Sequence, residues 1–155
     1  MMYVLRLCLI LALAVPGLAA ARTVKITTLL KRYNGPEAYI AIYLTDQNGQ
    51  YQQTLWVAGY HHQYYRHLPG WARGSRLQHS EYDGRTGASM LGGESLTVTA
   101  DIADKFIDSG YEIRVDTAVE DRSENRADVV APLTTAGSDQ SVNGKAYVKT
   151  LVYTL

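Results

Sequence analysis

The residues best suited to a specific chemistry form the run Asp83-Gly84-Arg85-Thr86-Gly87-Ala88-Ser89. Asp-Gly is a common turn dipeptide, but a turn requires neither the second glycine and the alanine nor the hydroxyl that ends the run. Small residues keep the backbone narrow and bendable, so that the active site of a modifying enzyme can close around the hydroxyl of Ser89. The run therefore indicates a serine presented for covalent modification. The alternative is a glycine-rich loop between two strands with an ordinary exposed serine.

The run resembles the flavinylation motif of bacterial exported proteins, Asp-Gly/Ala-x-Ser/Thr-Gly-Ala-Thr/Ser. The matching positions are Asp83, Gly84, Thr86, Gly87, Ala88 and Ser89. In that motif a Mg-dependent flavin transferase links the last hydroxyl to the phosphate of FMN, so the resemblance implies a phosphoester between FMN and Ser89. Where the family more often has threonine, this chain has serine. Arg85, together with Arg73 and Arg76 upstream, is expected to partner the phosphate through charge-assisted hydrogen bonds.

Residues 60–82 precede the motif and concentrate aromatic and basic side chains. They include His61, His62, Tyr64, Tyr65, His67, Trp71 and His79. Helical spacing predicts a short helix that is interrupted near Pro69-Gly70. We expect Tyr64, Tyr65 and Trp71 to form a wall on which the isoalloxazine ring of a flavin stacks. Four histidines are also compatible with a metal or haem site, but none is spaced from a carboxylate as a tight ligand motif requires, so no metal is predicted.

The N-terminal residues 1–21 have the pattern of an export signal. Arg6 is the only charge, an apolar run follows, and small residues at Ala19 and Ala21 satisfy the A-x-A rule, which predicts cleavage before Arg22. The apolar run is far shorter than the roughly 20 residues that span a membrane. The single cysteine, Cys8, lies inside this segment, so the mature protein is expected to have neither disulfides nor thiolate metal sites. The sequence predicts a periplasmic protein.

The mature residues 22–155 suit one domain with a real core. In the full chain fifteen basic residues balance fifteen acidic ones and no basic block occurs, which argues against nucleic acid as a partner. Alternation of apolar and polar residues predicts strands over 23–32, 37–46, 51–58, 94–100, 111–119 and 145–155. Asn48-Gly49 predicts a hairpin between the second and third of these runs. Residues 101–110 are expected to form a polar connector, 121–125 a charged turn and 129–143 an irregular excursion.

Six or seven short strands in a chain of this size predict a mainly β fold, an immunoglobulin-like β-sandwich with a long inserted loop and short helix. A small barrel is the second choice. The insertion, residues 60–93, is where function is expected, because scaffolds place chemistry on loops.

At the level of the whole chain, the arrangement resembles domain-of-unknown-function family 2271, a set of predicted bacterial periplasmic proteins. The resemblance rests on the strand at 39–46, the aromatic segment at 64–71, the motif at 83–89 and the strand at 111–120. It implies a carrier of FMN attached by a flavin transferase, which relays electrons with an inner-membrane protein of the PepSY type. The competing hypothesis is a cofactor-free β-sandwich that uses residues 60–82 to bind a ligand or a protein. A hydrolase is disfavoured, because the sequence places no histidine or acid beside Ser89 to activate it.

Overall fold

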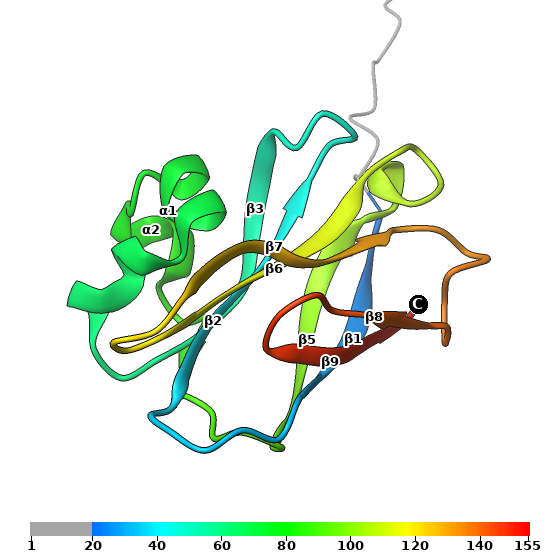
Figure 1. Ribbon diagram of the computed structural model, residues 1–155. Helices are drawn as coiled ribbons and strands as arrows, with labels where there is room; N and C mark the ends of the chain where they lie inside the picture. Colours follow the sequence, from blue (N-terminus) through cyan, green and yellow to red (C-terminus); the bar gives the residue numbers. More distant parts are fainter. Residues whose placement is uncertain (1–19) are drawn as a thin grey trace, which may run out of the picture.

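In the computed structural model, which describes residues 20–155, the strands form two sheets that pack as a sandwich (Figure 1). The first sheet has the order β5-β1-β9-β8, with β1 at Ala21–Leu30, β5 at Ser95–Ala103, β8 at Ser141–Asn143 and β9 at Val148–Thr154. The second has the order β4-β3-β2-β6-β7, with β2 at Ala38–Thr45, β3 at Tyr51–Ala58, β4 at Thr86–Gly87, β6 at Glu112–Val119 and β7 at Glu124–Pro132. Neighbouring strands are antiparallel except for β4, which runs parallel to β3. The predicted mainly β sandwich is confirmed.

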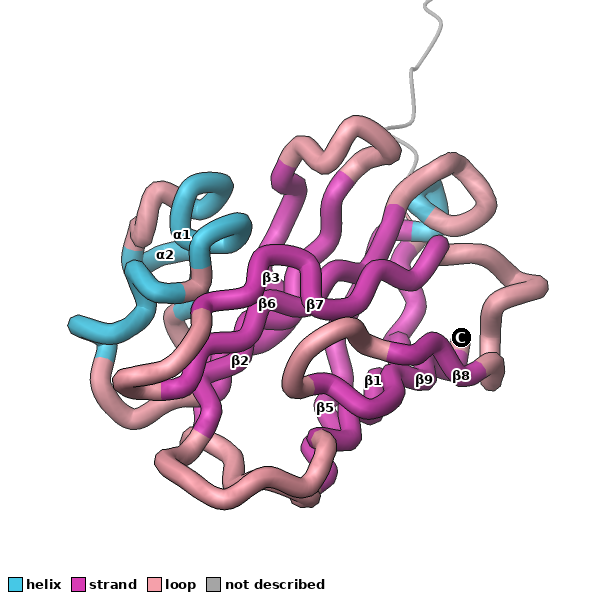
Figure 2. The backbone as a smooth tube through the Cα atoms, viewed as in Figure 1, coloured by secondary structure: helices cyan, strands magenta, loops and turns pink. Residues whose placement is uncertain are grey.

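The helices of the insertion between β3 and β5 gather at one side of the sandwich (Figure 2). They are the 3-10 helix η1 at His62–His67, α1 at Pro69–Ser75 and α2 at His79–Tyr82. Pro69 begins α1, where its missing N–H costs no helical hydrogen bond. The predicted interruption at Pro69-Gly70 is therefore present as a boundary between two helices. A second 3-10 turn, η2, lies at Asp104–Phe106.

β2 is the central strand of the molecule, because all eight of its residues are buried. Ile40, Ile42 and Leu44 face the core between the two sheets, where residues of β1 and β6 also pack. The intervening residues Tyr39 and Tyr43 belong to a second cluster on the opposite face. The hairpin to β3 through Asn48-Gly49 is confirmed, and Gly49 has the positive φ of +77° that this turn requires.

The second cluster joins the insertion to the outer face of the second sheet. Its buried members are Tyr39, Ala41, Tyr43, Val57 and Ala118 from the strands and Tyr65, Leu68, Trp71 and Tyr82 from the insertion. A buried carboxylate, Asp116 of β6, holds the start of α1 in place. It accepts hydrogen bonds from the backbone N–H groups of Gly70 (2.6 Å) and Trp71 (2.9 Å) and from the hydroxyl of Tyr43 (2.8 Å). The insertion is thus a packed layer of the fold and not a free loop.

Three sequence expectations need correction after Ala100. β5 continues to Ala103, into the predicted polar connector. The predicted turn and irregular excursion contain a nine-residue strand, β7, followed by the short strand β8. The first half of β7 is mostly polar and gives no alternating pattern. A buried acid stabilises the strand. Asp128 accepts hydrogen bonds from the hydroxyl of Thr117 and from four consecutive backbone N–H groups, those of residues 145–148.

Candidate functional site

The motif at 83–89 connects the end of α2 to Met90, which pairs with Ala38 at the start of β2. Asp83 follows α2, and Gly84 adopts a positive φ of +69° with no other atom near the place where a Cβ would be. Thr86 and Gly87 then form β4 beside Val57 and Ala58. Hydrogen bonds from the N–H of Val57 to the carbonyl of Arg85 (2.9 Å) and from the N–H of Gly59 to the carbonyl of Gly87 (2.8 Å) fix this segment to β3.

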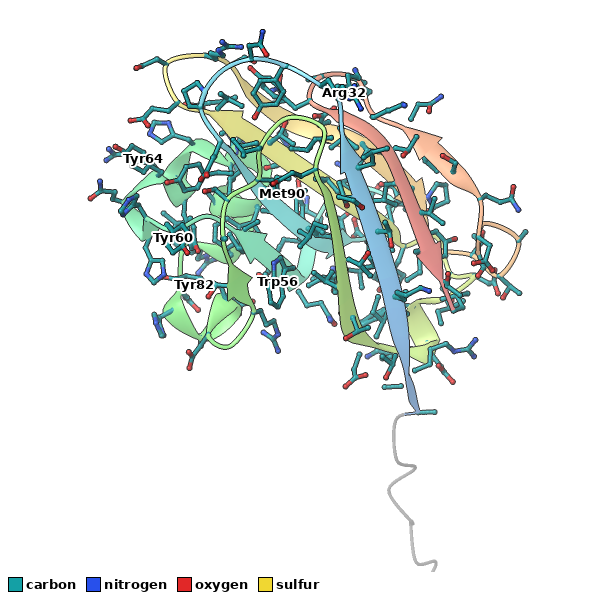
Figure 3. The ribbon with its side chains drawn as sticks, turned by 90° about the horizontal axis from the view of Figure 1, so that it is seen from below. Arg32, Trp56, Tyr60, Tyr64, Tyr82 and Met90 are labelled. Carbon is teal, nitrogen blue, oxygen red and sulfur yellow. The ribbon has the colours of Figure 1, made fainter. Side chains whose placement is uncertain are left out.

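The space beside Trp56 requires a glycine at position 87, a constraint that the sequence alone does not show. A Cβ at this position would lie 2.9 Å from the indole of Trp56, closer than real Cβ contacts. The motif's second glycine therefore lets β4 pass close to the indole of Trp56. In Figure 3, Trp56 lies between the insertion and the first sheet, below Met90.

Ser89 is held between two backbone anchors. β4 is the first, and the second is a bridge in which Met90 and Ala38 exchange hydrogen bonds of 2.7 Å and 3.0 Å between their backbone groups. Met90 is buried in the main core. Ala88 and Ser89 thus form a narrow, two-residue span whose ends are fixed. The hydroxyl of Ser89 donates to the carboxylate of Glu37, the residue before β2.

The Ser89 side chain lines an open hollow of about 310 Å³, which we call the attachment hollow. Its lining consists of Pro36, Glu37, Tyr39, Tyr60, His61, Ser89 and Glu120. Tyr60 is the most exposed large hydrophobic residue of the described chain, with 73% of its surface accessible. The sequence-based site missed Glu37, Tyr39, Tyr60 and Glu120. Tyr60 alone carried a signal, as the first aromatic residue of the segment at 60–82.

The attachment hollow adjoins a second one of about 210 Å³, because Tyr39 and Glu120 line both. We call it the tyrosine hollow. The rings of Tyr39 and Tyr64 lie 5.5 Å apart at a tilt of 55°, and the hydroxyl of Tyr64 donates to the carboxylate of Glu120 (3.1 Å). Burial is the main cause that raises the pKa of Tyr39 above its ordinary value. The rim of the hollow carries Arg122 and a His67–Glu124 pair whose Nδ1 and Oε1 are 2.5 Å apart.

The predicted stacking wall must be corrected for two of its three members. Trp71 is 0% exposed and Tyr65 is 1% exposed, so neither can stack on a ligand in this structure. Trp71 donates its indole N–H to the hydroxyl of Thr54 (2.8 Å), and Tyr65 donates to the carbonyl of Gly59 (3.1 Å). Both side chains support the insertion from inside. Tyr64 is half-buried and faces the tyrosine hollow, so it remains a candidate.

The arginines are not placed at Ser89. Arg85 donates to the carbonyl of Glu81 (3.1 Å), at the α2 side of the motif. Arg73 lies in α1, and Arg76 ends that helix in a left-handed conformation. The charged groups around Ser89 are instead the carboxylates of Glu37 and Glu120. An acid does lie beside the serine, therefore, but the hydroxyl donates to it directly and without an intervening histidine, unlike in a Ser-His-Asp triad.

Two features are absent from residues 20–155. This part of the chain contains no cluster of three or more histidine, cysteine, aspartate or glutamate side chains arranged to hold a metal ion. It also contains no helix of sufficient length and apolar character to cross a membrane. The predicted signal segment, apart from Ala20 and Ala21, lies outside the described residues.

Most of the chain is similar to one known protein family. Residues 21–150 match the family described as "Predicted periplasmic protein (DUF2271)". No curated protein and no solved structure matches the chain. Because the match covers nearly all of the sandwich, the chain belongs to this family of predicted periplasmic proteins.

Proposed function

We propose that this protein carries FMN covalently on Ser89 and relays electrons in the periplasm. The observation that carries the proposal is the placement of the motif's last hydroxyl. Ser89 ends a segment of small residues, is held between two backbone anchors and opens onto a hollow. A buried or strand-paired serine in the same motif would argue against modification.

The residues fit the attachment chemistry. Formation of the phosphoester requires an activated FMN, for which FAD is the natural donor. In this transfer the Ser89 oxygen would bond to the FMN phosphorus of FAD, the pyrophosphate bond would break, AMP would leave, and the hydroxyl proton would pass to a base of the transferase or to solvent. Ala88 and Gly87 leave the backbone beside the hydroxyl narrow, so that the transferase can approach it. Glu37 already accepts the hydroxyl's hydrogen bond and thereby orients the oxygen.

The charges around Ser89 bear on how a phosphate attached there would be tolerated. Glu37 and Glu120 are carboxylates, and a phosphate between them would be repelled unless water screens the charges. Because both glutamates and the hollow itself are open to solvent, screening is available. The expected role of Arg85 as a phosphate partner is not part of the proposal, since its guanidinium contacts Glu81.

Bound FMN would supply one-electron and two-electron redox chemistry, while the protein holds and presents it. The partners are then a flavin transferase and an inner-membrane protein of the PepSY type. Exposed Tyr60 and Leu91, which lies two residues after Ser89, flank the attachment point and provide apolar surface for a transient contact. The competing function, a cofactor-free binding module that uses residues 60–82, loses support from the burial of Tyr65, Trp71 and Tyr82.

The proposal is tested by producing the protein with a flavin transferase, FAD and Mg²⁺ and measuring its intact mass. The wild type should gain one FMN less one water, and Ser89→Thr should gain the same adduct. Ser89→Ala should gain none, while its folding stays unchanged. Ser80→Ala, which removes an exposed hydroxyl from α2, is the matched control and should be modified like the wild type. Absence of the adduct from a wild type exposed to a competent transferase contradicts the proposal.

A further inference from the structure

Two further hollows lie near the motif and are candidate positions for the ring of a flavin tethered at Ser89. The tyrosine hollow shares Tyr39 and Glu120 with the attachment hollow, which Ser89 lines. The other, of about 240 Å³, is lined by Trp56, Gly84, Arg85, Thr99 and Asp101 among others. We call it the Trp56 hollow. Figure 3 shows Tyr60 and Tyr64 on the side of the insertion, away from Trp56.

We propose that the isoalloxazine ring of the attached flavin lies in the tyrosine hollow, against the half-buried Tyr64 and beside the largely buried Tyr39, with its polar edge towards Arg122. This inference rests on the proposed attachment at Ser89. It replaces a stack on Trp71 or Tyr65, which burial prevents.

Access is the first argument. Tyr39 and Glu120 line both the attachment hollow and the tyrosine hollow, so the two hollows adjoin, and the ribityl arm of FMN on Ser89 would start beside the tyrosine hollow. The Trp56 hollow is lined by Gly84 and Arg85, at the start of the motif, and not by Ser89.

Chemical fit is the second argument. The isoalloxazine ring is flat, with an apolar dimethylbenzene end and a hydrogen-bonding pyrimidine end. Tyr39 and Tyr64 line the tyrosine hollow, and the hydrogen bond to Glu120 holds Tyr64 in place. The imidazole of His67 lines it too, but its Nδ1 pairs with Glu124 and its Nε2 accepts a hydrogen bond from Nε of Arg66 (3.4 Å). The guanidinium of Arg122, which also lines the hollow, donates to the carbonyl of Asn34 and lies 5.9 Å over the ring of Tyr33; because a guanidinium has five N–H donors, others are left for the pyrimidine end.

The test starts from protein whose intact mass confirms the adduct, so that failure of attachment is recognised separately from failure of the ring placement. The chain has four histidines, and their imidazole NMR signals are compared between flavinylated wild type and Ser89→Ala treated identically. The signal of His67 should shift through the ring current of the flavin. His79, which lies in α2, is the internal control and should not shift. An unchanged His67 signal in the flavinylated protein would overturn the placement.

Flavin fluorescence provides the second measurement on the same sample. Native wild-type protein should fluoresce less than the denatured protein, because aromatic contact quenches the flavin. Tyr64→Leu should raise the native fluorescence towards the denatured level, and Trp56→Phe should leave it unchanged. The opposite pattern, with a rise in Trp56→Phe and none in Tyr64→Leu, would place the ring in the Trp56 hollow and overturn the proposal. Equal fluorescence of native and denatured wild type would overturn it as well.

Discussion

The contact between Gly87 and Trp56 shows how a single residue sets the course of the motif. β4 can pair with β3 only because position 87 presents no side chain to the indole. Gly84 differs, because nothing lies near its missing Cβ and its positive φ is the constraint. The motif thus contains one glycine required by space and another required by backbone conformation.

These two glycines predict different responses to alanine. Gly87→Ala should lower the free energy of unfolding by about 1–3 kcal/mol, because the new Cβ forces the indole of Trp56 to move. Gly84→Ala should cost about 1–2 kcal/mol through backbone strain alone. Chemical denaturation in a wild-type and a Trp56→Phe background separates the causes. The smaller ring should reduce the cost of Gly87→Ala and leave that of Gly84→Ala unchanged; equal costs of Gly87→Ala in both backgrounds would refute the steric explanation.

The sequence could identify the motif but not the neighbours of Ser89. Glu37 and Ser89 are 52 positions apart, and they meet only because Met90 bridges to Ala38. That bridge joins two loop ends, for which periodicity gives no signal. Spacing within residues 60–82 also could not decide which aromatic rings face inward. Tyr65 and Trp71 face inward because they pack with Tyr39 and Tyr43, whose side chains lie on the outer face of β2.

At the level of elements, the helical insertion is held to the sheet by an apolar cluster and by Asp116. Trp71 is the largest of its fully buried side chains and packs edge-on against Tyr65, at a centroid distance of 5.5 Å. The insertion carries one wall of the attachment hollow. Its packing therefore determines the shape of the candidate site.

Trp71 and Tyr64 should respond differently to truncation. Trp71→Ala should cost about 3–5 kcal/mol of unfolding free energy, because it leaves a cavity and removes the hydrogen bond from the indole N–H to the Thr54 hydroxyl. Tyr64→Ala should cost about 1 kcal/mol, because its ring is half-buried and its hydroxyl bonds an exposed glutamate. Urea denaturation curves measure both values. Similar, small costs for the two variants would mean that the insertion is not packed as described.

Where apolar and polar residues alternate along a strand, the sequence predicts which residues are buried. Val24, Ile26, Thr28 and Leu30 of β1 are buried as the pattern requires. β7 contradicts the pattern because a carboxylate takes the place of an apolar residue. Asp128 is 1% exposed, and the groups that satisfy it come from Thr117 and from residues 145–148. A tertiary contact of this kind has no local sequence signal.

Asp128 therefore gives a prediction at this scale. Asp128→Asn keeps the shape but replaces an oxygen with an amide donor that faces backbone N–H groups. We expect a loss of about 3 kcal/mol, from weakened charge-assisted hydrogen bonds and at least one unpaired donor. Asp121→Asn, at an exposed turn position, is the matched control and should change stability by less than about 0.5 kcal/mol. Equal denaturation midpoints for the two variants would contradict the assigned role.

At the scale of the whole molecule, buried phenols make stability depend on alkaline pH. Desolvation is the main cause that raises the pKa values of Tyr43, Tyr51 and Tyr65 above the ordinary value of about 10. The neighbouring carboxylate of Asp116 adds to the shift at Tyr43, and a hydrogen bond to Glu81 adds to it at Tyr51. The pKa of Tyr65 reaches about 12, with Tyr82 as the second cause.

The sign of this effect follows from proton binding. Above about pH 10 the unfolded chain releases phenol protons that the folded protein retains, so unfolding becomes more favourable as pH rises. The contribution is complete below about pH 10 and is lost as pH rises through the raised values. Urea midpoints should fall between about pH 8 and about pH 11. Tyr65→Phe, which removes one of the three groups, should show a smaller fall; a wild-type midpoint that does not change over this range would contradict the prediction.

The placement of flavin on Ser89 is tested most directly by locating it within the chain. Trypsin cuts after Arg85 and next after Lys105, so the motif's hydroxyls fall in one fragment, residues 86–105. After modification by a flavin transferase, this fragment should carry the flavin fluorescence and the added mass, and fragmentation should place that mass on Ser89. A flavin found on Thr86, on another fragment or on none would contradict attachment at Ser89.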